Sequence, residues 1–152
     1  MFLQKTLLIA LSIVTLNFTA YAQESLNNKP INTEKIYQMA LLHLKPKASK
    51  EFKKKGISLM KEAGENGHLK AQITLTRAYK RGYMVEKNDR KAFIWASKAA
   101  AQDNAEAKTY LGEMYLKGIG TQKDKKKGTR LLIEAKNQGF AKAKEKLDAL
   151  EV

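Results

Sequence analysis

The side chains that most often carry catalysis or bind metals are scarce in this 152-residue sequence. There is no cysteine, which excludes disulfides, cysteine–metal sites and thiol nucleophiles, and His43 and His68 are the only histidines. No His-Glu-x-x-His or Gly-x-Ser-x-Gly pattern occurs, and the pair Gly118 and Gly120 follows no strand, as a phosphate-binding loop would. The 15 acidic residues show no spacing that favours a glycosidase pair. We therefore expect no enzymatic activity, no metal site and no cofactor.

The charge balance is strongly basic, with 29 lysines and arginines against 15 acidic residues and a formal net charge of +14. In a cytosolic protein this balance would point to nucleic acid. The N-terminus favours export instead, because Lys5 precedes an apolar run that ends in Ala20-Tyr21-Ala22. We expect residues 1–22 to be a signal peptide cleaved after Ala22, since the run contains Asn17 and is short for a spanning helix of about 20 apolar residues.

The expected mature chain therefore has no transmembrane segment, lies in the periplasm or is secreted, and binds no nucleic acid. Its formal net charge is +13, because cleavage removes only Lys5 among the charged residues. Outside the inner membrane a basic surface attracts anionic lipids, acidic glycans, cell wall or acidic proteins.

The sequence repeats itself with a period of 36 residues. Nine of 36 positions match without a gap, and the pairs are Ala71/Ala107, Leu75/Leu111, Tyr79/Tyr115, Gly82/Gly118, Lys87/Lys123, Lys91/Lys127, Ala99/Ala135, Gln102/Gln138 and Ala105/Ala141. Each period holds two apolar stripes of helical spacing, separated by a glycine turn. The repeated unit is thus helix, turn, helix, and alanine lets the paired helices approach closely while Trp95, Tyr79 and Tyr115 fill wider gaps in the core.

The segments "AEAKTYLGEMYLKGIGTQKDKKKG" and "KAFIWASKAAAQ" resemble the Sel1-like repeat family, relatives of the tetratricopeptide solenoids. The resemblance covers residues 71–142 well and implies an all-α, right-handed α/α solenoid. We expect about three repeats, at residues 35–70, 71–106 and 107–142, followed by a cap at 143–152. The repeat domain would span residues 34–152, after a flexible segment at 23–33.

Some positions depart from the family pattern: Thr76 and Met84 replace glycines, and Gly128 replaces an alanine. Because methionine enters the left-handed conformation at a cost, we expect the turn containing Met84 to differ from the turn containing Gly120. Pro46 should end the first helix near Leu44.

Both histidines have structural explanations within this register. His43 corresponds to Tyr79 and Tyr115, which favours a place in the core or at a groove edge over metal binding. His68 begins a helix beside Gly67, and we expect its side chain to be exposed.

Solenoids commonly bind other molecules on a concave face, which the first helix of each repeat would line. Opposite the expected buried stripe of the second repeat, four of five residues are basic, and three of the five equivalent positions in the first repeat are apolar. The expected partner-binding residues are Tyr37, Leu41, Leu44, Lys70, Ile73, Arg77, Lys80, Arg81, Thr109, Glu113, Leu116 and Lys117.

Three functions remain open on this basis. The family resemblance favours an exported adaptor or scaffold that binds an acidic, partly apolar protein segment through a basic groove. It also permits an immunity protein that neutralises an exported antibacterial toxin. A binder of cell-wall or envelope polyanions, driven by charge, is the third.

Overall fold

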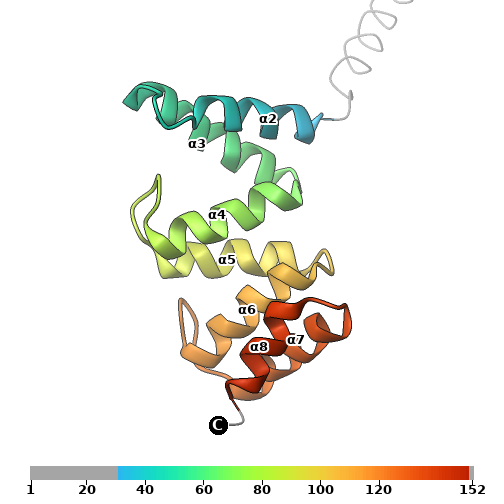
Figure 1. Ribbon diagram of the computed structural model, residues 1–152. Helices are drawn as coiled ribbons and strands as arrows, with labels where there is room; N and C mark the ends of the chain where they lie inside the picture. Colours follow the sequence, from blue (N-terminus) through green and yellow to red (C-terminus); the bar gives the residue numbers. More distant parts are fainter. Residues whose placement is uncertain (1–30, 151–152) are drawn as a thin grey trace, which may run out of the picture. The chain divides into compact units, whose positions relative to one another are not determined.

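The computed structural model describes residues 31–150, and within them there are seven helices and no strand (Figure 1). The all-α repeat fold expected from the sequence is confirmed. The expected signal peptide and most of the segment 23–33 lie outside the described residues. The helices are α2 Thr33–His43, α3 Lys50–Glu65, α4 Leu69–Arg81, α5 Asp89–Ala100, α6 Ala105–Lys117, α7 Lys125–Asn137 and α8 Ala141–Asp148.

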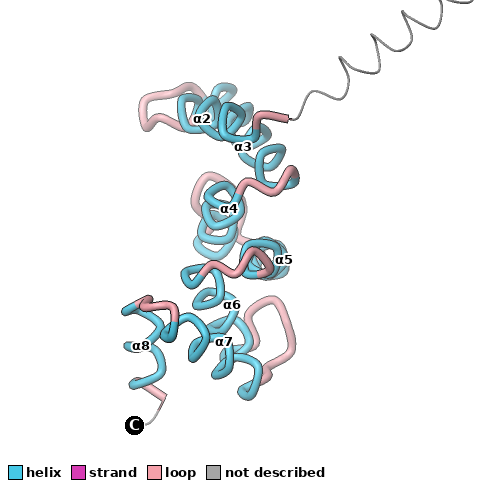
Figure 2. Tube along the Cα trace, turned by 90° about the vertical axis from the view of Figure 1, so that its right-hand side faces the viewer, coloured by secondary structure: helices cyan, strands magenta, loops and turns pink. Residues whose placement is uncertain are grey.

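Within the compact unit of residues 32–152, the helices pair in sequence order, α2 with α3, α4 with α5 and α6 with α7. Each pair also packs on the next, through α3 with α4 and α5 with α6 (Figures 1 and 2). Helix α8 packs against α7 and, more weakly, α6. It thus occupies the place that a first helix takes in the other repeats.

Polar N-caps and glycine C-caps set most helix boundaries. The side chains of Asn88, Asn104 and Asp124 each accept a hydrogen bond from the backbone N–H three residues later. Helices α4 and α6 end at Gly82 and Gly118, which adopt the left-handed conformation. Helix α2 ends at His43 with Leu44 as its C-cap, which confirms the boundary expected two residues before Pro46.

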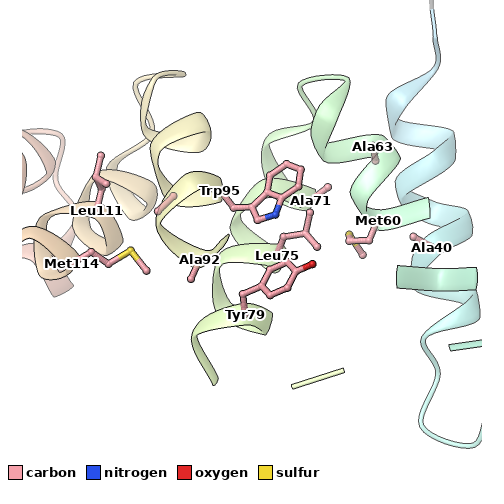
Figure 3. Packing of buried hydrophobic residues seen from close by; sticks show 11 residues of the cluster. Ala40, Met60, Ala63, Ala71, Leu75, Tyr79, Ala92, Trp95, Leu111 and Met114 are labelled. Carbon is pink, nitrogen blue, oxygen red and sulfur yellow. The ribbon is translucent and has the colours of Figure 1, made fainter. Parts of the chain in front are cut away.

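Alanines bring the helices together, and a few large side chains fill the remaining space (Figure 3). Ala63, Ala71 and Ala92 are fully buried, and Trp95 is only 7% exposed. In Figure 3 the Trp95 ring lies beside Leu75 and Ala71. The core position expected for Trp95 is therefore confirmed.

The side-chain amides of Gln102 and Gln138 link consecutive repeats. Gln102 Nε2 donates to the carbonyl oxygen of Gly67 at 2.9 Å and to Gln72 Oε1 at 2.7 Å. One repeat later, Gln138 Nε2 donates to Asp103 Oδ1 at 3.1 Å. These bonds explain why glutamine recurs at this position of the 36-residue register.

The expectation that the turn at Met84 differs from the turn at Gly120 is wrong. Met84 has φ 66°, and Gly120 has φ 67°. The backbone bonds match as well, since Asn88 N–H donates to the Tyr79 carbonyl and, one repeat later, Asp124 N–H donates to the Tyr115 carbonyl. The loop therefore holds Met84 in the left-handed region, at a cost of about 1–2 kcal/mol.

The expected exposure of His68 is also wrong, because its side chain is only 9% exposed. Its Nδ1 accepts the Ala71 N–H, so Nε2 carries the proton and donates to Glu34 Oε2 at 2.9 Å. The ring stacks on Tyr37 with 4.4 Å between ring centres. As the N-cap of α4, His68 is covered by α2 of the preceding repeat. His43, in turn, is half-buried and stacks on Phe52.

Candidate functional site

A pocket of about 320 Å³ opens between the first helices of successive repeats. We call it the α4–α6–α8 pocket, after the three helices that line it. Its lining residues are Arg77 and Arg81 of α4, Glu106, Thr109, Tyr110 and Glu113 of α6, Phe140 at the N-cap of α8 and Lys142 within α8. Its volume lies near the lower end of the range typical of ligand sites, about 300–1,000 Å³.

The pocket presents basic side chains that are available to a ligand. Arg77 and Arg81 are four residues apart on α4 and so share one face of the helix. Both are exposed, as is Lys142. Within residues 31–150 none of the three forms an ion pair. Guanidinium groups of this kind bind carboxylates through two parallel hydrogen bonds.

The carboxylate of Glu113 in the pocket is already neutralised. It accepts hydrogen bonds from Lys80 Nζ at 3.0 Å and Lys146 Nζ at 2.7 Å, and its side chain is only 10% exposed. Burial opposes ionisation of Glu113, but the bonds and charges of Lys146 and Lys80 outweigh burial and lower its pKa. The Glu113 carboxylate thus joins α4, α6 and α8. Among the other lining residues, Arg77, Arg81 and Lys142 outnumber the one remaining carboxylate, Glu106, so the pocket keeps a net positive charge.

Two aromatic side chains make the pocket partly apolar. Tyr110 is half-buried, and burial, with a contribution from Glu106, raises the pKa of its phenol. The phenol therefore stays neutral near pH 7 and can donate a hydrogen bond. Phe140 stands at the N-cap of α8 and makes no side-chain capping bond. The arrangement can hold an anionic group beside an apolar one.

Only part of the expected binding set lines this pocket. Arg77, Arg81, Thr109 and Glu113 do, although Thr109 is buried and donates to the Ala105 carbonyl at 2.8 Å. Six others lie outside the lining. Lys80 is bound to Glu113, and Lys70 and Lys117 are exposed elsewhere on the surface. Tyr37, Leu41 and Leu44 belong to the first repeat.

Ile73 and Leu116 pack inside the solenoid and do not lie on an open face. Ile73 is 6% exposed and packs with Ala99 and Ala107. Leu116 packs on the cluster around Leu132. The physical reason is that a first helix packs on its own second helix and on the preceding second helix. Side chains of α4 also contact α6 of the next repeat, so the buried face of α4 is wider than one stripe.

Four lining residues were not in the expected set: Glu106, Tyr110, Phe140 and Lys142. The repeat register could have found two of them, because Glu106 and Lys142 occupy the position of Lys70 one and two periods later. No such signal exists for Tyr110, whose register partner is Thr74.

No group of three histidine or acidic side chains in residues 31–150 is placed to hold a metal ion. No helix in the same range is long and apolar enough to cross a membrane.

Comparison with known proteins matches the Sel1 repeat model to residues 71–104 and 105–140. The chain is a Sel1-like repeat protein. Helices α4–α5 and α6–α7 fall in these two matches, and α2–α3 precede them.

Solved Sel1-like repeat structures share the fold. This Sel1-like repeat protein superposes on one from Oxalobacter formigenes with a TM-score of 0.64 and 24% identity, covering 80% of this chain and 36% of the other. A protective antigen of uropathogenic Escherichia coli with an SLR fold superposes with a TM-score of 0.69 and 25% identity, and the match covers 80% of this chain and 26% of the antigen. Cysteine-rich protein B of Helicobacter pylori superposes with a TM-score of 0.57 and 21% identity, and the match covers 72% of this chain and 87% of the other.

Among curated proteins, chitin synthase regulatory factor 3 of Schizosaccharomyces pombe is 35% identical over 88 residues, which is 57% of this chain. The Sel1-like repeat protein spans only 9% of that relative's length. Proteins with Sel1 repeats are generally interaction modules and typically lack catalysis.

Proposed function

We propose that this Sel1-like repeat protein is an exported, non-enzymatic adaptor that binds an acidic, partly apolar segment of a protein partner in the α4–α6–α8 pocket. One observation carries the proposal. Arg77 and Arg81 have no ionic partner within residues 31–150 and line a pocket with Tyr110, while the resident Glu113 is already held by two lysines.

The chemistry of the pocket favours a carboxylate ligand beside an apolar side chain. A partner aspartate or glutamate would pair with the guanidinium of Arg77 or Arg81. An adjacent apolar residue would contact Tyr110 and Phe140, and burying these aromatic rings away from water would stabilise the complex. A uniform polyanion uses the charges alone and leaves the aromatic part of the pocket empty.

Export places this interaction in the periplasm or outside the cell, where anionic envelope components are also within reach. This part of the proposal rests on residues 1–22, which lie outside the described residues. An immunity role is a special case of the same proposal, in which the partner is an exported toxin. The identity of the partner separates the two.

A peptide selection tests the proposed site. Random peptides displayed on phage are selected on the purified protein, and the enriched sequences are synthesised for affinity measurement. We expect the winners to share an acidic residue beside an apolar or aromatic one. Enrichment of purely acidic runs, or of apolar sequences with no acid, would contradict the proposed pocket chemistry.

The matched variants are Arg77→Glu with Arg81→Glu, and Lys125→Glu with Lys126→Glu as the control of equal charge change. Lys80 is left intact, because reversing its charge would place a carboxylate beside the buried Glu113. We expect the arginine variant to lose more than about a hundredfold in affinity, since each charged hydrogen bond contributes about 1.5–3 kcal/mol. Equal losses in both variants would mean that net charge alone explains binding.

A further inference from the structure

A second pocket lies at the start of α3, where the loop after α4 approaches it. It measures about 490 Å³ and is lined by Lys50, Lys53, Lys54, Ile57 and Met84. Helix α3 supplies four of these residues, and the loop between α4 and α5 supplies Met84. In Figure 1 that loop extends toward the start of α3 on the left of the view. We call it the α3 pocket.

The loop at Met84 meets α3 less closely than the corresponding loop at Gly120 meets α5. At Gly120, the register partner of Met84, a methyl group would collide with the carbonyl oxygen of Asp89. That loop therefore sits directly on the start of α5, and Arg90 binds the Gly120 carbonyl at 3.2 Å. Between α3 and the loop after α4 there is room for the methionine side chain and for the pocket beside it.

The charge of this site is also confined to the first repeat. Lys50, Lys53 and Lys54 have Glu86, Asp89 and Arg90 as their register partners in the second repeat. The three lysines form no ion pair within residues 31–150. Further exposed lysines come from the same stretch of sequence, namely Lys45, Lys47 and Lys55.

Exposed apolar groups accompany the lysines. Ile57 and Met84 line the pocket, and Phe52 and Tyr83, next to lining residues in the sequence, are 58% and 65% exposed. Met84 is moreover held at φ 66°, where a glycine would be relaxed. A residue whose strained backbone reduces the stability of the fold, and whose side chain lines a pocket, is characteristic of a functional position.

We propose that the α3 pocket docks this protein on the surface of an anionic phospholipid bilayer. Lysines attract the phosphate groups, at about 1 kcal/mol for each lysine near the surface. Ile57, Met84 and the neighbouring aromatic rings enter the boundary between headgroups and acyl chains, where amphipathic side chains are favoured. This site is separate from the α4–α6–α8 pocket and shares no residue with it.

Vesicle sedimentation tests the proposal. The full chain is mixed with vesicles of phosphatidylcholine, or of phosphatidylcholine with phosphatidylglycerol, and the bound fraction is measured. We expect binding only to the anionic vesicles. Lys50→Gln, Lys53→Gln and Lys54→Gln together should weaken it about a hundredfold. The control, with Lys123→Gln, Lys125→Gln and Lys126→Gln, should stay within a few-fold of the unmodified protein. All these proteins keep residues 1–22, so binding through that segment would be equal in them.

Met84→Gly separates the apolar contribution from folding. Glycine suits the φ of this position, so the melting temperature should be unchanged or raised. Affinity for the anionic vesicles should fall about tenfold, because the apolar side chain is gone.

Four results would overturn the proposal: no preference for anionic vesicles, equal losses in the two lysine variants, full binding by Met84→Gly, or a lower melting temperature of Met84→Gly. Displacement of the protein from vesicles by the acidic peptides selected on the α4–α6–α8 pocket would also overturn it, because the α3 pocket would then be a protein site.

Discussion

The contact between Gly64 and Trp95 joins the first repeat to the second and makes a sharp test of the packing. Gly64 lies in α3 and is buried, and Trp95 lies in α5. A methyl group on Gly64 would lie 2.9 Å from Trp95 Cζ3 and 3.1 Å from Leu75 Cδ1. The indole ring therefore occupies the space that any side chain at position 64 would need.

The geometry sets the expected free energies of unfolding. Trp95→Ala should cost about 3–5 kcal/mol, because it leaves a cavity between the repeats. Gly64→Ala alone should cost about 0.5–2 kcal/mol, since overpacking outweighs the gain in helix propensity. In the Trp95→Ala background the ring is absent, so Gly64→Ala should instead stabilise by about 1 kcal/mol. The effect of one methyl group thus reverses its sign.

Urea unfolding of the four proteins, analysed by linear extrapolation, measures the coupling between the two positions. We expect a coupling of about 2 kcal/mol. An equal effect of Gly64→Ala in both backgrounds would refute the packing described here. A melting temperature of Trp95→Ala equal to that of the unmodified protein would show that Trp95 is not a core residue.

Three further predictions concern Gly120, Met84 and Glu113. Gly120→Ala should lower the free energy of unfolding by more than about 2 kcal/mol, because its methyl group would collide with the Asp89 carbonyl at a left-handed φ of 67°. Met84→Gly, at the same register position, should raise the free energy of unfolding by up to about 1 kcal/mol. Thermal melts in which both substitutions shift the melting temperature in the same direction would contradict this. Glu113→Gln should lower stability at pH 7 by about 1–3 kcal/mol. The pKa of Glu113 is lowered in the folded protein, so its contribution is present above the ordinary value of 4.5 and is lost as the pH falls through the folded pKa. Acid titration should therefore show the variant losing less stability below pH 4.5 than the unmodified protein, and parallel curves would contradict the pairing.

The fold could be predicted from the sequence because the repeat register carries it. Ala71, Leu75 and Tyr79 recur at the same spacing 36 residues later, and an alanine stripe followed by a glycine turn has few other solutions. The end of α2 near Leu44 could also be predicted, because Pro46 lacks the backbone N–H that a longer helix would need. The prediction for the turn at Met84 is wrong because the hydrogen bonds of the whole loop outweigh the conformational preference of one residue.

The candidate site could be predicted only in part. Arg77 and Arg81 face outward by helical spacing alone, and they line the pocket. The burial of Ile73 depends on Ala99 and Ala107, which arrive from two other helices. The α3 pocket depends on how closely a loop meets the second helix of the repeat before it, which differs between Met84 and Gly120, and a repeat register describes only what the repeats share.

The most direct test of the account is to map where an acidic peptide binds. Proton–nitrogen correlation spectra of the isotope-labelled protein, recorded with and without a peptide from the selection, report the environment of each backbone amide. The account predicts that the shifts concentrate on Arg77, Arg81 and Tyr110 and on the start of α8. Shifts confined to the first repeat, or spread evenly over the lysine-rich surface, would contradict binding in the α4–α6–α8 pocket.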